Sequence, residues 1–172
     1  MDNNKIEKQT FTYPFLFRLI FRYGNFFVTL LLASYSLPLI LYIDENLIFV
    51  IPLLVNFILI YFINKYYINN YNILPFNIEA DDEKIVCAKF FLSKKKITIN
   101  YSDISLLQGG SFENKSSGIM KVYTENNSIC IGFHSRLNNS SKLVSYIISK
   151  VNRSLYEQVL EKISNKKKDY VS

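Results

Sequence analysis

The stretch that decides the fold is GNFFVTLLLASYSLPLILYIDENLIFVIPLLVNFILIYFIN, residues 24–64. It contains two uncharged apolar runs, 24–43 and 46–64, which only Asp44 and Glu45 separate. Each run is about 20 residues long and as a helix would cover roughly 30 Å, the thickness of the hydrocarbon core of a bilayer. Because the connection is so short, the sequence predicts an antiparallel pair of transmembrane helices, a membrane α-hairpin over residues 24–64.

Other interpretations of these runs fit less well. A cleaved signal peptide would be shorter, would end in a small-residue cleavage site and would not be followed at once by a second span. A buried helical hairpin of a soluble protein is the other alternative. Pro38, Pro52 and Asn56 interrupt the runs, and we expect Asn56 to hydrogen-bond across helices or between subunits. Neither run contains a charge, so a small transporter or channel subunit is the less favoured function.

Basic residues near the span ends predict the orientation. Lys5, Lys8, Arg18 and Arg22 precede the first run, Lys65 closes the second, and the turn between the runs has no Lys or Arg. Cytoplasmic segments carry the excess of positive charge in membrane proteins. We therefore expect a multi-pass protein of the inner or plasma membrane with both termini in the cytoplasm.

The segment 11–23, FTYPFLFRLIFRY, leads into the first span. Arg18 and Arg22 lie four residues apart and would share one face of a helix. The segment is either a short helix at the membrane interface, with both arginines reaching headgroups, or the lower end of the first span. We assign 1–23 to a cytoplasmic or interfacial N-terminal segment and expect Arg18, Arg22 and Lys65 at the membrane interface.

A second domain follows a connector at 65–75. Short β-like runs separated by turn residues predict strands, at 76–80, 84–92, 96–100, 104–107, 119–125 and 128–133, with Asn126 and Asn127 in the last turn. Apolar residues then recur every three or four positions from Leu143 to Leu155, a pattern that extends to Ile163 and predicts one amphipathic helix. The expected domain covers 76–165, and 166–172 is a basic tail.

The run IEADDEKIVCAKFFLSKKKITINYSDISLL, residues 78–107, resembles the bacterial pleckstrin-homology-like domain. The resemblance covers about residues 74–160 and includes the step Ile99-Asn100-Tyr101-Ser102-Asp103-Ile104. It implies a small, partly open β-barrel capped by the C-terminal amphipathic helix. Such domains are often fused to a two-helix membrane hairpin, and the family has no catalytic residues to carry over. The expected fold class is thus a membrane α-hairpin plus an α+β, mainly-β domain. In the step at 99–104 we expect the Asp103 side chain to hold the following turn as a hydrogen-bond acceptor.

Three consecutive cations, Lys94, Lys95 and Lys96, are predicted at a turn between strands, where Lys89, Lys115 and Lys121 could join them. They form a solvated turn, a contact with anionic membrane lipid, or a contact with a protein partner. Nucleic acid is not an expected partner, because the aromatic residues occupy apolar strand positions instead of alternating with these lysines.

The sequence offers little catalytic chemistry. His134 is the only histidine, and its neighbour Ser135 would form only an incomplete catalytic pair. Asp81, Asp82 and Glu83 are predicted to form a turn, and Cys87 and Cys130 to be reduced thiols. We therefore expect that the protein is not an enzyme and needs no cofactor or metal. The predicted function is a membrane-anchored interaction or scaffold module that binds a protein partner or self-associates. Envelope stress or bacteriocin protection would be its setting.

Overall fold

The computed structural model describes residues 8–125 and 129–169, with side chains as far as Ser164. It divides into two compact units. One is the helical hairpin Phe15–Asn72, and the other joins the residues before Phe15 to those from Ile73 onward. The predicted turn residues Asn126 and Asn127, like Lys5, lie outside the described residues.

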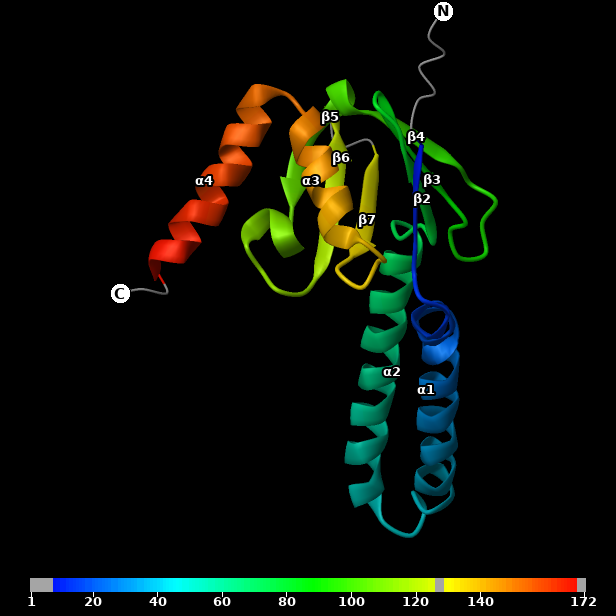
Figure 1. Cartoon of the computed structure of the whole chain (residues 1–172). Coiled ribbons are helices and arrows are strands. Elements are labelled where there is room, and N and C mark those ends of the chain that lie inside the picture. Colours follow the sequence, from blue (N-terminus) through cyan, green and yellow to red (C-terminus); the bar gives the residue numbers. More distant parts are fainter. Residues whose placement is uncertain (1–7, 126–128, 170–172) are drawn as a thin grey trace, which may run out of the picture. The chain divides into compact units, whose positions relative to one another are not determined.

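The hairpin consists of α1, Phe15–Leu41, and α2, Val50–Tyr71, joined through a 3-10 turn, η1, at Leu47–Phe49 (Figure 1). Both helices are long and apolar enough to cross a membrane, and in each apolar window only 11% of the residues are buried. Asn46 caps η1 by accepting the Ile48 N–H at 2.9 Å. Of the segment 11–23, the residues from Phe15 onward belong to α1, which runs unbroken to Leu41, whereas Phe11 and Thr12 belong to a strand.

The β domain has seven described strands in two antiparallel sheets that are not closed into one barrel. The first sheet has the order β1-β2-β3-β4 and the second the order β5-β6-β7. The strands are β1 Gln9–Thr12, β2 Asn77–Ala80, β3 Lys84–Ala88, β4 Ile97–Asn100, β5 Ile104–Gln108, β6 Ile119–Thr124 and β7 Cys130–His134, with 3-10 turns η2 Tyr101–Asp103 and η3 Gly110–Glu113.

Strand β1 differs from the prediction, which placed residues 1–23 outside the β domain. It pairs with β2 in the register Gln9↔Ala80 to Thr12↔Asn77, and Lys8 adds an ion pair to Glu79. The whole hairpin is therefore inserted between two neighbouring, hydrogen-bonded strands. The sequence did not reveal this strand because a run as short as Gln9–Thr12 becomes a strand only through its distant partner.

The core of the domain lies between the two sheets and α3, Ser140–Lys150. A cavity of about 10 Å³ remains there, roughly the space of one water molecule. Its lining is wholly apolar and comes from both sheets and α3: Ile78, Ile85, Cys87, Ile99, Val122, Ile131, Phe133, Leu143 and Ile147. The interior is thus filled by side chains, and α3 contributes Leu143 and Ile147 to it.

The C-terminal helix is broken, where the sequence predicted one continuous helix. Val151 is extended (φ −73°, ψ 165°), and α4 begins afresh at Arg153 and reaches Asp169, into the predicted tail 166–172. The Asn152 side chain accepts the Leu155 N–H at 2.8 Å, which is the bond of a helix N-cap. Apolar spacing did not reveal the break because Leu155 continues the buried stripe on α4.

Candidate functional site

The three lysines of the predicted tip lie in a longer loop than expected, residues 89–96 between β3 and β4. Strand β3 ends at Ala88, four residues before the predicted end at 92. Lys94, Lys95 and Lys96 are all exposed, and Lys89 belongs to the same loop. The structure therefore gathers four cations in one connection, which we call the lysine loop.

Short-range contacts hold the lysine loop in place. The Phe90 ring is buried in the core, and the Ser93 N–H donates to the Phe90 carbonyl at 3.4 Å. The Lys95 N–H donates to the Ser93 hydroxyl at 3.1 Å. Leu92, which lies between Phe90 and Ser93, has a positive φ of 51° and a side chain that is 87% exposed. The loop is thus anchored by one aromatic residue and displays another apolar side chain among its cations.

The other lysines considered for this site are placed elsewhere. Lys115 follows η3 and forms an ion pair with Glu113 at 2.6 Å, which lowers the pKa of the Glu113 carboxyl. Lys121 lies on β6, the central strand of the second sheet. Neither residue belongs to the lysine loop.

The candidate interface residues lie at one end of the hairpin. Arg18 and Arg22 are in the first part of α1, and Lys65 is in the last part of the antiparallel helix α2. The Lys65 ammonium lies 5.5 Å from the centre of the Tyr61 ring, a cation–π contact. The Tyr71 hydroxyl donates to the Arg22 carbonyl at 3.2 Å and ties the two helices together at this end.

Between α1 and α2 runs a polar seam, whose members are Asn25, Thr29, Ser36, Asn56 and Asn64. The Asn56 amide donates to the Ser36 hydroxyl at 2.6 Å, as expected for an interhelical role of Asn56. The Asn25 amide donates to Asn64 at 2.9 Å, and the Asn64 amide donates to Thr29 at 3.0 Å. Our sequence interpretation did not single out Asn25 and Asn64, although both occupy the same helix faces as the other members.

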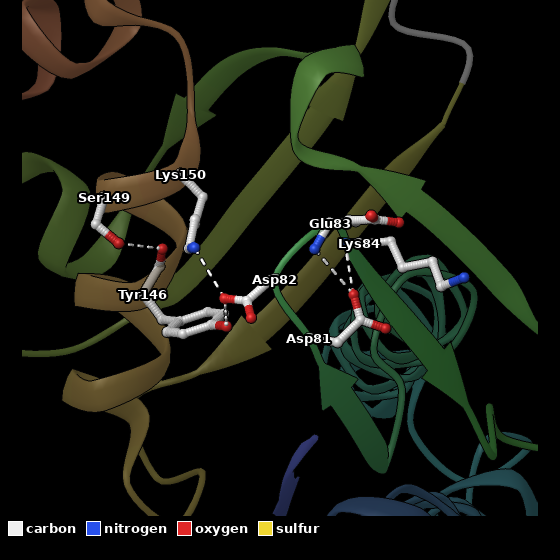
Figure 2. Close-up of polar contacts among 7 residues, drawn as sticks. All are labelled: Asp81, Asp82, Glu83, Lys84, Tyr146, Ser149 and Lys150. Atoms are coloured by element: carbon white, nitrogen blue, oxygen red, sulfur yellow. Dashed lines mark hydrogen bonds and ion pairs between the residues drawn. The ribbon is translucent and has the colours of Figure 1, made fainter. Parts of the chain in front are cut away.

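The acidic turn between β2 and β3 has a structural role, and Figure 2 shows the polar contacts that its side chains make. Asp81 accepts the N–H groups of Glu83 and Lys84, at 3.0 and 2.9 Å, and so forms the predicted turn. Asp82 accepts the Tyr146 hydroxyl at 3.0 Å and the Lys150 ammonium at 2.9 Å. The bond from Lys150 lowers the pKa of the Asp82 carboxyl and raises the pKa of Lys150. These contacts fasten α3 to the first sheet.

The step at 99–104 carries the chain from the first sheet to the second. Asp103 accepts hydrogen bonds from the Asn100 amide at 2.8 Å and from the Ser102 hydroxyl at 2.9 Å, so it holds the turn that precedes it and not the following turn that was expected. Next to it, burial raises the pKa of the Tyr101 hydroxyl, which is buried and has no hydrogen-bond partner among the described residues. The Tyr101 ring packs edge-on against Tyr146.

His134 ends β7, and Ser135 begins the turn that follows it. The Ser135 hydroxyl is 3.3 Å from His134 Nδ1, and the Arg136 N–H donates to the same nitrogen at 3.2 Å. Burial, with a smaller effect of Arg136, lowers the pKa of His134. The nitrogen that would have to act as the base for Ser135 is therefore already accepting a backbone hydrogen bond, which is the geometry of a turn.

Strand β7 holds both chain segments that connect the β domain to the hairpin. The His134 N–H donates to the Tyr13 hydroxyl at 2.8 Å, and the Gly132 N–H donates to the Ile73 carbonyl at 2.8 Å. A Cβ at Gly132 would lie 2.9 Å from the Ile119 side chain and 3.4 Å from those of Ile73 and Leu74. Glycine at this position thus lets the returning segment lie close against β7.

We found no match to this chain among protein-family models, curated proteins or solved structures.

Proposed function

We propose that this chain is a non-enzymatic, membrane-anchored interaction module. The α-hairpin spans the inner or plasma membrane, and the β domain works at its cytoplasmic face. The observation that carries this proposal is the insertion of the hairpin between β1 and β2, two strands of one sheet. Only Tyr13 and Pro14 separate β1 from α1 in the sequence.

The side chains of the hairpin support the membrane location. Large apolar residues throughout the hairpin are exposed, among them Phe15, Leu31, Leu41, Leu47 and Ile51. Core helices of soluble proteins bury such residues, whereas membrane-spanning helices turn them toward lipid. Helices of this length and composition that bury so little of their apolar surface are best accommodated by hydrocarbon.

The pairing of β1 with β2 supports a topology with both flanks of the hairpin on one side. Strands that hydrogen-bond to each other share one compartment, and β1 precedes the hairpin while β2 follows it. The cations Arg18, Arg22 and Lys65 lie at the hairpin end nearest these strands in the sequence. The positive-inside tendency then favours the cytoplasm for the whole β domain and for both termini.

Two unclosed sheets packed against α3 support the resemblance to bacterial pleckstrin-homology-like domains, which implies a partly open barrel with a helical cap. Because the interior is filled, we propose that ligands bind on the outside, at the loops and the strand edges. The lysine loop is the surface we favour. The partner of this surface is membrane lipid, another protein or a second copy of the chain. The proposed setting is envelope stress or bacteriocin protection.

The polar seam supports a packing role for the hairpin and disfavours the alternative of a transporter or channel subunit. The amides of Asn25, Asn56 and Asn64 all donate hydrogen bonds between the helices. Polar residues used in this way associate membrane helices, at about 0.6–2 kcal/mol each.

A pair of reporter fusions tests the proposed placement. A reporter that is active only outside the cytoplasm, fused after Ser172, should be inactive, while the same reporter fused after Glu45 in the hairpin turn should be active. Affinity purification in mild detergent should then recover partners with the full chain and not with the hairpin alone, residues 13–76. Strong activity after Ser172, or identical partners for both chains, would contradict the proposal.

A further inference from the structure

Leu92 is an unusual residue for the conformation it adopts. The hydrogen bond from Ser93 to Phe90 closes a turn in which Leu92 is the third residue, with φ of 51°. A positive φ at this position favours Gly or Asn, because a Cβ then lies close to the backbone. The chain carries a large apolar side chain there instead.

The folded domain gains little from this side chain. Leu92 is 87% exposed, the largest exposed fraction among the exposed large apolar residues of the described chain. The neighbouring Phe90 is buried and provides the anchor of the loop. A residue whose type does not suit its backbone conformation, and whose side chain has no packing role, is expected to serve function.

The surroundings of Leu92 indicate the chemistry of its partner. Lys89 precedes it, and Lys94, Lys95 and Lys96 follow it within the same loop, all exposed. An apolar tip with cations around it is complementary to an anionic bilayer, in which the tip enters the acyl boundary and the ammonium groups meet lipid phosphates. A purely solvated turn would account for the lysines but not for the leucine.

We infer that the lysine loop is a second membrane contact of this protein, in which Leu92 inserts into an anionic lipid surface while Lys89 and Lys94–Lys96 bind its headgroups. This inference rests on the proposed membrane anchoring and deepens it, because it names the partner of the exposed loop. Tethering by the hairpin keeps the local lipid concentration high, so a contact of low intrinsic affinity is populated.

The absence of tryptophan from the sequence offers a direct test. The full chain carrying Leu92→Trp is placed in nanodiscs of phosphatidylglycerol or of phosphatidylcholine. In the anionic nanodiscs the introduced tryptophan should emit at shorter wavelength and lose most of its fluorescence to lipids brominated on the acyl chains. The effect should weaken in phosphatidylcholine, at high salt, and on changing Lys94, Lys95 and Lys96 to Ser.

A matched control is Tyr156→Trp, because Tyr156 is an aromatic residue on α4 that is 40% exposed. Leu92→Gly should fold at least as stably as the wild type, since glycine suits the positive φ. If the chain incorporates into nanodiscs but the tryptophan at position 92 behaves like the control, the bilayer contact is wrong and a protein partner becomes the better explanation. Destabilisation by Leu92→Gly would also overturn the inference. If the full chain does not incorporate into nanodiscs, the proposed membrane anchoring is overturned as well.

Discussion

The backbone N–H of His134 donates a hydrogen bond to the hydroxyl of Tyr13 across 2.8 Å, although 121 positions separate the two residues in the chain. Tyr13 comes just before the hairpin, and His134 ends β7. Beside this bond, the Asn138 N–H donates to the Thr12 carbonyl at 3.1 Å. The segment that leads into the helical hairpin is thereby held by both the first sheet and the end of the second.

Removal of the Tyr13 hydroxyl should weaken this connection. In Tyr13→Phe the ring remains but this part-buried hydrogen bond to the His134 N–H is lost, and a bond of this kind contributes about 0.5–1.5 kcal/mol. Denaturant unfolding of the β domain in the detergent-solubilised full chain should show a loss of this size. Tyr156→Phe, at a partly exposed position, serves as the control and should change stability little; an equal loss in both variants would contradict the role of Tyr13.

The stability of the domain should fall on mild acidification because of His134. Burial lowers the pKa of His134 below its ordinary value of 6.5 in the folded state, so the unfolded chain binds the proton more readily. The stabilisation is therefore complete above about pH 6.5 and is lost as the pH falls toward the folded pKa. Thermal melts of the wild type and of His134→Asn from pH 7.5 to 5 measure this effect. The variant keeps an acceptor without titrating, so its melting temperature should depend less on pH; equal slopes would contradict the assignment.

The packing of α3 predicts a severe effect of a charge at Ile147, whose side chain is 1% exposed and lines the apolar interior. Ile147→Asp should lose roughly 4 kcal/mol or more and unfold the β domain, because no described partner there can compensate a carboxylate. Ser145→Asp places the same charge on the exposed side of α3 and should be tolerated. Circular dichroism melts of both variants decide the point, and an Ile147→Asp variant that melts like the wild type would show that α3 does not cap the core.

Within the hairpin, Asn56 should contribute to helix association. Asn56→Leu keeps the number and branching of the side-chain heavy atoms but loses the bonds to the Ser36 hydroxyl and the Leu32 carbonyl, so the hairpin should lose about 0.6–2 kcal/mol of stability. Unfolding in increasing sodium dodecyl sulfate, followed by energy transfer between dyes at the two helix ends, would measure this. Val55→Leu is the neighbouring control on an exposed face, and it should leave the transition unchanged.

The parts of the fold that follow from local patterns could be predicted from the sequence. Two uncharged runs separated only by Asp44 and Glu45 predict the hairpin, and alternating residues such as Ile97 and Ile99 mark the strands that bury one face. The insertion of the hairpin could not be predicted, because β1 takes its strand character from pairing with β2. For the candidate site, the lysines were visible as a charge run. The exposure of Leu92 was not, since Phe90, Phe91 and Leu92 form one apolar run whose burial depends on where β3 ends.

A disulfide cross-link between β1 and β2 tests the central claim, the insertion of the hairpin into the β domain, most directly. Thr10 and Glu79 are partners in the register, so in a background of Cys87→Ala and Cys130→Ser the pair Thr10→Cys and Glu79→Cys should oxidise readily in the membrane-embedded chain. The control pair Thr10→Cys and Asn100→Cys spans the sheet from β1 to β4, about 14 Å at the usual strand spacing, and should not oxidise. With a protease site inserted after Glu45, the predicted result is that only the first pair keeps the two cleaved halves together on a non-reducing gel. Separation of the halves in both variants would contradict the insertion of the hairpin between paired strands.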